Sequence, residues 1–247
     1  MEILIANDDG YQAKGLEVLA SIMEELGHVT IVAPNGGRSG QSNAVTMGAP
    51  MRLKQIAHTD KRDTYVSDGT PTDCVKLGLE VLCKNHKPDI VVAGINHGSN
   101  ASVNVIYSGT MGIVFTACEQ GVPAIGFSLD DHRQEADFSY FAKYIKEIVL
   151  LLKDEKASIC WNVNAPIGQL KGYRFTRQCR AHWAEDVVST ADPQGNPIYW
   201  LAGYLNNDEP EAADTDLYAM QEGYISICPS SIDTTEHNAL NKLNGKI

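Results

Sequence analysis

The chain has 247 residues, 43% of them hydrophobic, and a formal net charge of −11 with a pI near 5.0. A broad acidic field disfavours binding to duplex nucleic acid or to an anionic membrane surface. It leaves room for a small phosphorylated substrate, because a bound cation reverses the sign of the charge locally. The sequence has no run of 18 apolar residues, so we expect no transmembrane helix.

The N-terminus and the cysteines indicate a cellular compartment. The first residues read as a core strand and lack the basic and apolar regions of a signal peptide. The six cysteines are scattered and form no Cys-x-x-Cys pair: Cys74, Cys83, Cys118, Cys160, Cys179 and Cys228. This usage is typical of reduced thiols and not of a disulfide framework or a zinc site. We therefore expect a cytoplasmic protein.

Strand and helix patterns alternate in chain order through the first part of the sequence. We expect strands at 2–6, 28–33, 89–93 and 123–129, a hairpin at 51–58 and 63–67, a loop at 34–48, and helices at 14–26, 71–83, 108–120 and 137–153. Helices of this length between strands imply right-handed crossovers and a parallel sheet.

The pattern changes after residue 155. We expect a strand at 159–163, a long polar excursion at 184–213, a short helix at 215–222, a strand at 224–228 and a polar tail from Ser231. The predicted fold is therefore α/β, with a parallel-sheet core in residues 1–155 and a β-rich extension in residues 156–247.

The most informative motif follows the first strand, where Asn7-Asp8-Asp9-Gly10 leads directly into a helix. In an open α/β sheet, ligands bind outside the carboxyl ends of the strands. Two carboxylates placed there repel each other and lose hydration, and a hard divalent cation relieves both penalties. The alternative interpretation is a simple turn, because these residue types favour turns for local reasons.

Three further polar clusters follow predicted strands or begin a helix. They are Arg38 to Asn43, Gly94 to Asn100, and Ser108-Gly109-Thr110. Each cluster alone is weak evidence for a functional site. A Ser-Gly-Thr at a helix start is commonly only a cap, and an Asn-rich loop is commonly only a turn. All of them should nevertheless converge on one edge of the sheet, and together they supply what phosphate chemistry needs.

The residue types suggest the division of roles. Asp8 and Asp9 offer anionic oxygens to a metal, and Ser39 and Asn96 offer neutral oxygens that complete its shell. A helix N-terminus binds anions, and amide groups donate to phosphate oxygens, which assigns Asn43, Asn100, Ser108, Gly109 and Thr110 to a phosphate pocket.

Other features carry less weight. His97 could serve as a general acid, but we interpret it as a solvated loop histidine. Arg38 either meets the substrate phosphate or only braces the acid pair. The three tryptophans Trp161, Trp183 and Trp200 are interpreted as core or interface residues and not as stacking platforms for bases. The sequence contains no Gly-x-Gly-x-x-Gly after the first strand, no P-loop and no Gly-x-Ser-x-Gly elbow.

These motifs together resemble the survival protein SurE family of metal-dependent 5′/3′-nucleotidases. The resemblance covers nearly the whole chain and rests on Asn7–Gly10, Arg38–Ser42, Ser67–Val75, Gly94–Asn100, Tyr107–Thr110, Asn162–Asn164, Thr215-Asp216 and Gly223–Ser226. The sequence departs from the family at Thr116-Ala117, where a Glu-Gly pair is usual, and at Asn104, where an acid is common.

The resemblance implies a SurE-like fold with a Rossmann-like sheet between two helical layers, in which residues 1–155 are the catalytic core and residues 156–247 carry oligomerisation elements and complete one domain. It also implies a homodimer or homotetramer with a swapped or extended C-terminal part, and one Mg²⁺ or Mn²⁺ per subunit on Asp8, Asp9, Ser39 and Asn96. It implies hydrolysis of nucleoside monophosphates to nucleoside and phosphate, with 3′-nucleotides and polyphosphate as further possible substrates.

Asp8 and Asp9 are the expected catalytic residues, and either one orients the attacking water or accepts its proton. A direct aspartyl nucleophile is the competing mechanism. A non-catalytic nucleotide sensor and a sugar-nucleotide transferase are the competing functions.

Overall fold

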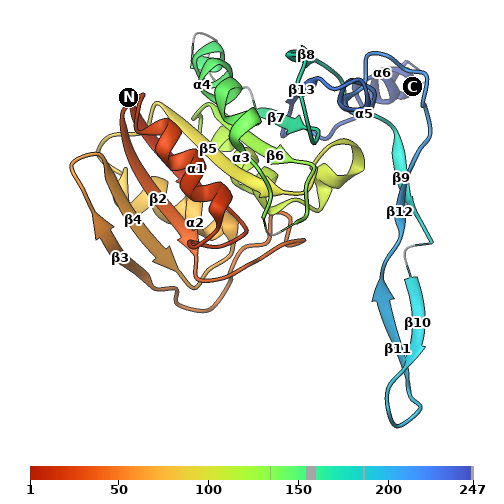
Figure 1. Cartoon of the computed structure of the whole chain (residues 1–247), viewed down its shortest axis with the longest axis horizontal. Coiled ribbons are helices and arrows are strands. Elements are labelled where there is room, and N and C mark those ends of the chain that lie inside the picture. The colour runs from red at the N-terminus through yellow and green to blue at the C-terminus, as the bar shows by residue number, and fades with distance from the viewer. Residues whose placement is uncertain (134, 154–159, 186, 246–247) are drawn as a thin grey trace.

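The computed structural model describes residues 1–133, 135–153, 160–185 and 187–245. Its main feature is a nine-stranded sheet of order β3-β4-β2-β1-β5-β6-β7-β13-β8, with helices on both faces (Figure 1). The strands are β1 (Glu2–Ala6), β2 (His28–Pro34), β3 (Leu53–His58), β4 (Arg62–Ser67), β5 (Ile90–His97), β6 (Ala124–Leu129), β7 (Cys160–Ala165), β8 (Tyr173–Phe175), β9 (Ala181–Ala184), β10 (Val187–Ala191), β11 (Pro197–Leu201), β12 (Tyr204–Asn207) and β13 (Ile225–Ser230). The helices are α1 (Lys14–Met23), α2 (Pro71–Leu77), the π-helix η1 (Gly78–Leu82), the 3₁₀-helix η2 (Ser102–Ile106), α3 (Gly109–Glu119), α4 (Ser139–Lys153), α5 (Asp216–Gln221) and α6 (His237–Asn244).

Six neighbouring strands, from β4 to β7 in the sheet order, are parallel. The chain runs outward from β1 through β2 to β4, returns to β5 beside β1, and runs outward again through β6 to β7. The direction of winding therefore reverses between β1 and β5. This is the switch point at which doubly wound α/β proteins bind their ligands. The predicted parallel α/β core is confirmed.

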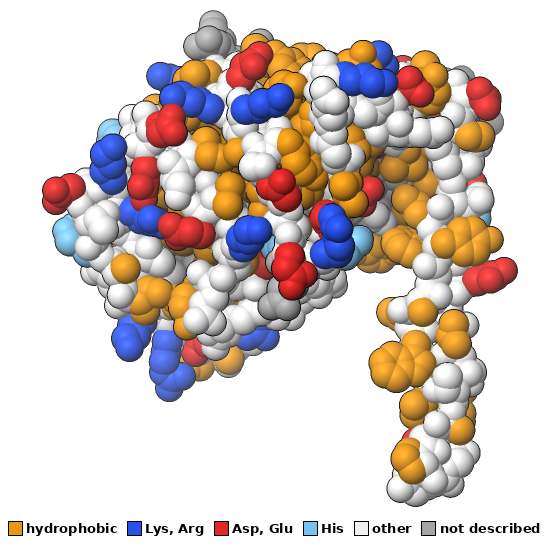
Figure 2. Space-filling model, viewed as in Figure 1, with side chains coloured by type: hydrophobic (Ala, Val, Ile, Leu, Met, Phe, Trp, Pro, Cys, Tyr) orange, Lys and Arg blue, Asp and Glu red, His pale blue; other side chains and the backbone are white. Residues whose placement is uncertain are grey.

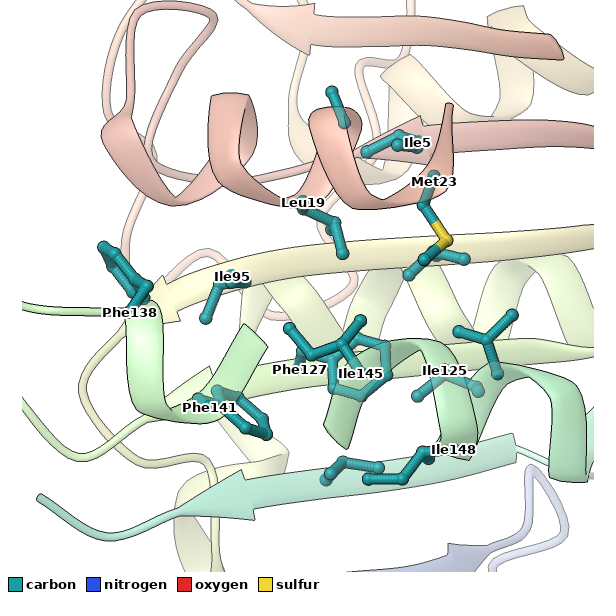
Figure 3. Close-up of a cluster of buried hydrophobic side chains, with 14 of the residues drawn as sticks. Ile5, Leu19, Met23, Ile95, Ile125, Phe127, Phe138, Phe141, Ile145 and Ile148 are labelled. Carbon is teal, nitrogen blue, oxygen red and sulfur yellow. The ribbon is translucent and has the colours of Figure 1, made fainter. Parts of the chain in front are cut away.

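Alternation along β1 divides the core into two layers. Ile3 and Ile5 pack with α1 and α4 on one face, whereas Leu4 and Ala6 pack with α2 and α3 on the other. Figure 3 shows the first layer, where Leu19 and Met23 of α1 lie above the sheet near side chains of α4. Burial on both faces explains why the strands are apolar runs and not alternating ones.

Several boundaries differ from the sequence expectation. The strand expected at 89–93 extends to His97, because Asn96 and His97 pair with Ser128 and Leu129 of β6 beyond a β-bulge. The first residue of the strand expected at 159–163 lies outside the described residues, as does the expected domain boundary at 155/156. The polar tail contains α6, which Glu236 caps by accepting the N–H groups of Asn238 and Ala239.

The residues after 160 contribute to two different structures. Strands β7, β13 and β8 continue the main sheet, with β13 antiparallel to β7. The expected excursion at 184–213 is a β-hairpin arm, in which β9 pairs with β12 and β10 with β11. The arm extends away from the body, and Figure 2 shows hydrophobic side chains along it. In the described part of the chain, no helix has the length and apolar character needed to span a bilayer.

Gly15 sets how closely α1 approaches β5. A Cβ added at this position would lie 2.1 Å from the backbone oxygen of Ile95. We expect Gly15→Ala to lower the free energy of unfolding by about 1–3 kcal/mol, since overpacking forces backbone shifts. Urea unfolding measures the change. Gly36→Ala is the control, because nothing lies within 4 Å of an added Cβ there. Equal stability of the two variants would contradict this account of the packing.

Candidate active site

The acid pair lies at the switch point of the sheet. Asp8 and Asp9 follow the last residue of β1, and Asn96 lies near the end of β5. These two strands are direct neighbours, with Ala6 opposite Ala93. The parallel register therefore brings both segments to the same edge, as the sequence predicts.

Asp8 is held from three directions. Its Oδ1 accepts a 2.7 Å hydrogen bond from the hydroxyl of Thr110, and its backbone oxygen accepts one of 2.6 Å from the N–H of Arg38. A Cβ added to Gly109 would lie 2.8 Å from the Cβ of Asp8. The absence of a side chain at Gly109 is therefore what allows the helix α3 to approach the carboxylate.

Burial raises the pKa of Asp8 from 3.8 to about 6, and the charge of Asp9 adds to this effect, whereas the hydrogen bond from Thr110 opposes it. Asp8 is only 4% exposed. The ionised carboxylate thus lies in a setting that destabilises its charge.

Asp9 is paired with a histidine. Its Oδ2 lies 3.2 Å from Nδ1 of His97 and accepts a 3.3 Å hydrogen bond from the backbone N–H of the same residue. The His97 ring also packs edge-to-face on Phe138, with ring centroids 5.1 Å apart. The interpretation of His97 as a solvated loop residue is therefore wrong: it lies at the end of β5, is half-buried and faces the acid pair.

The loop after β2 joins the site through backbone contacts. Ser42 donates its N–H to the oxygen of Tyr107 and its hydroxyl to the oxygen of Ile106, at 3.1 and 2.7 Å. Asn43 lies beside α3, since a Cβ added to Gly112 would be 2.9 Å from its Oδ1. Ser39 is exposed on the same loop.

Arg38 braces this loop. Its guanidinium donates to Oδ1 of Asn35 at 3.3 Å and to the backbone oxygen of Asp68 at 3.4 Å. These two contacts hold the loop, and only the backbone N–H of Arg38 reaches the acid pair, at the backbone oxygen of Asp8. The two roles that the sequence left open for this side chain stay predictions.

The N-terminus of α3 lies against Asp8. Ser108 caps the helix, because its hydroxyl accepts the N–H of Met111 at 3.0 Å. Gly109 and Thr110 follow in the first turn, where N–H groups have no intrahelical acceptor and favour anions.

Asn100 belongs to a buried polar network that sequence reasoning missed. Its Nδ2 donates to Ser128 Oγ at 2.8 Å, which occupies one of the two N–H groups of the amide that the sequence assigned to phosphate. Its N–H donates to Oδ1 of Asn164 at 2.7 Å, and its backbone oxygen accepts from Asn162 at 2.8 Å. The sequence does contain a signal for this network: Asn162 and Asn164 are polar side chains two residues apart on the otherwise apolar, buried strand β7.

The residues present fit a hard cation. Of the described residues, no lysine or arginine forms an ion pair with Asp8 or Asp9, and the contact of Asp9 is with a ring nitrogen of His97. The described chain also holds no group of three His, Cys, Asp or Glu side chains arranged for a metal, which leaves two carboxylates with neutral oxygens as the donor set. Asn96 donates its Nδ2 to the oxygen of Gly98 at 2.8 Å, so its Oδ1 is the amide atom left to accept or ligate.

A doubly wound parallel sheet with an acid pair and a helix N-terminus at its switch point defines a Rossmann-like protein with a site suited to phosphate and metal. Comparison with known families agrees with this class. Residues 3–185 match the model of the family described as survival protein SurE, and the chain therefore belongs to the SurE family.

Similar proteins cover nearly the full length. The chain is 45% identical to the 5′-nucleotidase SurE of Flavobacterium psychrophilum, over 98% of this chain and 96% of that protein. It is 41% identical to the 5′-nucleotidase SurE of Phocaeicola vulgatus, over 98% and 95%. The crystal structure of the SurE protein from Aquifex aeolicus superposes with a TM-score of 0.84 at 33% identity, covering 98% of each chain. The SurE-like fold expected from the sequence is confirmed.

Substitution of Asp8 tests the electrostatics of the site. With metal removed at pH 7, we expect Asp8→Asn to raise the free energy of unfolding by roughly 2–3 kcal/mol, because one pKa unit corresponds to about 1.4 kcal/mol and the pKa is raised from 3.8 to about 6. The folded pKa exceeds the unfolded one, so protonation stabilises the wild type at acid pH. That contribution is lost as pH rises from about 4 to about 6.

Urea unfolding in EDTA at pH 4 and pH 7 measures the effect. The gap between Asp8→Asn and the wild type should open with rising pH. Asp9→Asn is the matched control and should give a smaller gap, since Asp9 is more exposed and paired with His97. A variant less stable than the wild type at pH 7 would show that the carboxylate gains more from its hydrogen bonds than it loses by burial.

Proposed function

We propose that the chain is a metal-dependent 5′-nucleotidase, which hydrolyses nucleoside monophosphates to nucleoside and inorganic phosphate. The observation that carries the proposal is the pair of carboxylates, unneutralised by lysine or arginine among the described residues, against the N-terminus of α3. The 38–45% identity to curated 5′-nucleotidases over 98% of the chain supports the same reaction.

Asp8, Asp9, Ser39 and Asn96 would hold one Mg²⁺ or Mn²⁺ per subunit. When bound, such a cation lowers the charge repulsion between the phosphate and the acid pair and activates water for attack on phosphorus. Thr110 and Gly109 keep Asp8 in place for this role, the first by its hydrogen bond and the second by its lack of a side chain.

The phosphate group would bind between α3 and the two neighbouring loops. The N–H groups of Gly109 and Thr110 provide positive charge at the helix N-terminus, and Ser108 holds that turn in shape. Asn43, which lies beside α3, would contact the phosphate from the loop after β2. Asn100, in the loop after β5, would use the amide N–H that its bond to Ser128 leaves free. Phosphoryl transfer needs little beyond such positioning and charge neutralisation.

Water then attacks phosphorus in line with the leaving ribose oxygen. Asp9 is the better placed of the two acids to orient that water or accept its proton, because its side chain is 18% exposed whereas Asp8 is only 4% exposed. His97 lies on Oδ2 of Asp9 and holds this carboxylate in orientation. An aspartyl nucleophile would instead leave a phospho-enzyme that acid quenching traps.

We further propose that a second copy of the chain covers the arm, which gives a homodimer or homotetramer. None of the ten residues of β10 and β11 is charged, and Tyr199, Trp200 and Leu201 are more than half exposed. A two-stranded hairpin alone is marginally stable in water, so an apolar arm of this kind needs a partner. All six cysteines are free thiols, which supports a reducing, cytoplasmic location.

Phosphate release tests the reaction directly. After EDTA treatment, we expect no release from 5′-AMP, and release restored by Mn²⁺ or Mg²⁺. Asp9→Asn should lower kcat by about 10²–10⁴-fold, the contribution of a positioned acid or base, since the residue would orient the water and hold the metal. A colorimetric phosphate assay measures both.

Asp89→Asn is the matched control, because Asp89 is exposed just before β5 at the opposite end of the sheet. It should keep wild-type turnover. Metal-independent release would exclude the proposed metal site, and folded protein without release under either metal would favour a nucleotide sensor.

The arm makes a separate prediction. We expect Tyr199→Glu with Leu201→Glu to lower the molar mass in solution to that of a smaller assembly, because two carboxylates would be buried in an apolar interface. Light scattering after size exclusion measures it. Val81→Glu, at an equally exposed apolar residue of η1, is the control. A monomeric wild type would contradict the proposed interface.

A further inference from the structure

A cavity of about 440 Å³ lies at the carboxyl ends of β6 and β7. Asp130 and Pro166, which directly follow these strands, line it. Leu217 and Met220 of α5 form one wall, and they share a helix face because they are three residues apart. The base of the arm, where the chain leaves the body in Figure 1, closes the other side. The cavity has the size and the mixed apolar and polar lining of small-molecule sites.

The arm contributes an aromatic wall to this cavity. Trp183 of β9 and Leu205 of β12 lie directly opposite each other in the antiparallel pair, so both face the same side, and both line the cavity. The indole N–H of Trp183 donates to Oδ1 of Asn104 at 2.9 Å, and Nδ2 of Asn104 donates to the oxygen of Ser99 at 3.2 Å. The ring is therefore fixed in orientation, yet 40% of Trp183 is exposed.

The cavity adjoins the acid pair through one loop. Ser99 lines it and is the neighbour of Asn100. His132 also lines it and packs on Gly98, where an added Cβ would lie 2.2 Å from Cε1 of its ring. The residue before Gly98 is His97, whose Nδ1 lies 3.2 Å from Asp9. The loop from His97 to Asn104 thus has the proposed phosphate site on one side and this cavity on the other.

We propose that this cavity binds the nucleoside part of the substrate, with the base stacked on Trp183. The inference rests on the proposed phosphatase function, since it assigns the leaving group of that reaction. Stacking on an aromatic side chain tolerates any base, because every base has a π-face. Met220 and Leu205 cover the rest of the base, and Asp130 accepts hydrogen bonds from hydroxyl groups of the ribose.

The charge of the lining distinguishes a nucleoside from a polyphosphate chain as leaving group. Among the described residues that line the cavity there is no lysine or arginine, and Asp130 is an acid. A chain of phosphates placed there would meet a carboxylate and no fixed positive charge. A neutral nucleoside meets no such repulsion.

Binding of adenosine without metal tests the cavity independently of catalysis. We expect calorimetry in EDTA to detect adenosine binding to the full chain, and Trp183→Ala to weaken it about fivefold or more, the loss expected for one stacked base. Trp183→Phe keeps an aromatic face and should bind more tightly than Trp183→Ala. Phe175→Ala removes an exposed aromatic ring outside the cavity and should leave adenosine binding within about twofold.

Turnover then separates the two proposals. The ratio of kcat/KM for 5′-AMP to that for ribose 5-phosphate should fall about fivefold or more in Trp183→Ala, because only the first substrate carries a base. An equal loss with both substrates, or no adenosine binding by the wild type, would overturn the cavity assignment and leave the phosphatase intact. Adenosine binding that depends on Trp183, without metal-dependent phosphate release, would overturn the phosphatase and leave the cavity.

Discussion

The buried carboxylate of Asp8 is the constraint on which the rest of the site depends. It lies 4% exposed beside a second acid, and burial raises its pKa to about 6. An arrangement that costs folding free energy persists when the surrounding structure holds it in place. Here Thr110 fixes one oxygen, Gly109 lets the helix approach, and the N–H of Arg38 fixes the backbone. The site therefore stores unneutralised negative charge next to a positive helix terminus, which is the condition for binding a cation and a phosphate together.

The sheet topology makes this arrangement possible. Because β1 and β5 are parallel neighbours at the switch point, the segments that follow them meet without long loops. Two side chains of β7 hold the loop after β5 in place: Asn164 accepts the backbone N–H of Asn100, and Asn162 donates to its backbone oxygen. Buried polar side chains in an apolar sheet are stable only when they are hydrogen-bonded. Because Asn162 and Asn164 form these hydrogen bonds with the backbone of Asn100, the position of the loop depends on the interior of the fold.

The arm links this site to the rest of the SurE-like architecture. Its base contributes Trp183 to the cavity, and its return helix contributes Asp216, whose carboxylate accepts the N–H groups of Ser102 and Cys179 at 2.7 and 2.9 Å. Those bonds join the start of η2, two residues after Asn100, to the start of the arm. Burial raises the pKa of Asp216, and the hydrogen bonds from these two N–H groups oppose that rise because they stabilise the charged carboxylate. The hydrogen bonds of Asp216 therefore join the base of the arm to the loop that lines the cavity.

The sequence by itself determined the α/β class, most strand positions and the residues of the acid pair. These follow from local information: short apolar runs for the strands, period-3.6 patterns for the helices, and polar residues placed directly after apolar strands. It also carried the SurE motifs. Tertiary structure alone decided that His97 faces Asp9 and that Asn100 turns its amide to Ser128. It also decided that Trp183 lines a cavity together with its hydrogen-bond partner Asn104, which lies 79 residues earlier in the chain. Each of these depends on contacts between segments distant in the chain. Side-chain direction at such contacts is set by packing and by the need to satisfy buried polar groups, and neither leaves a periodic trace in the sequence.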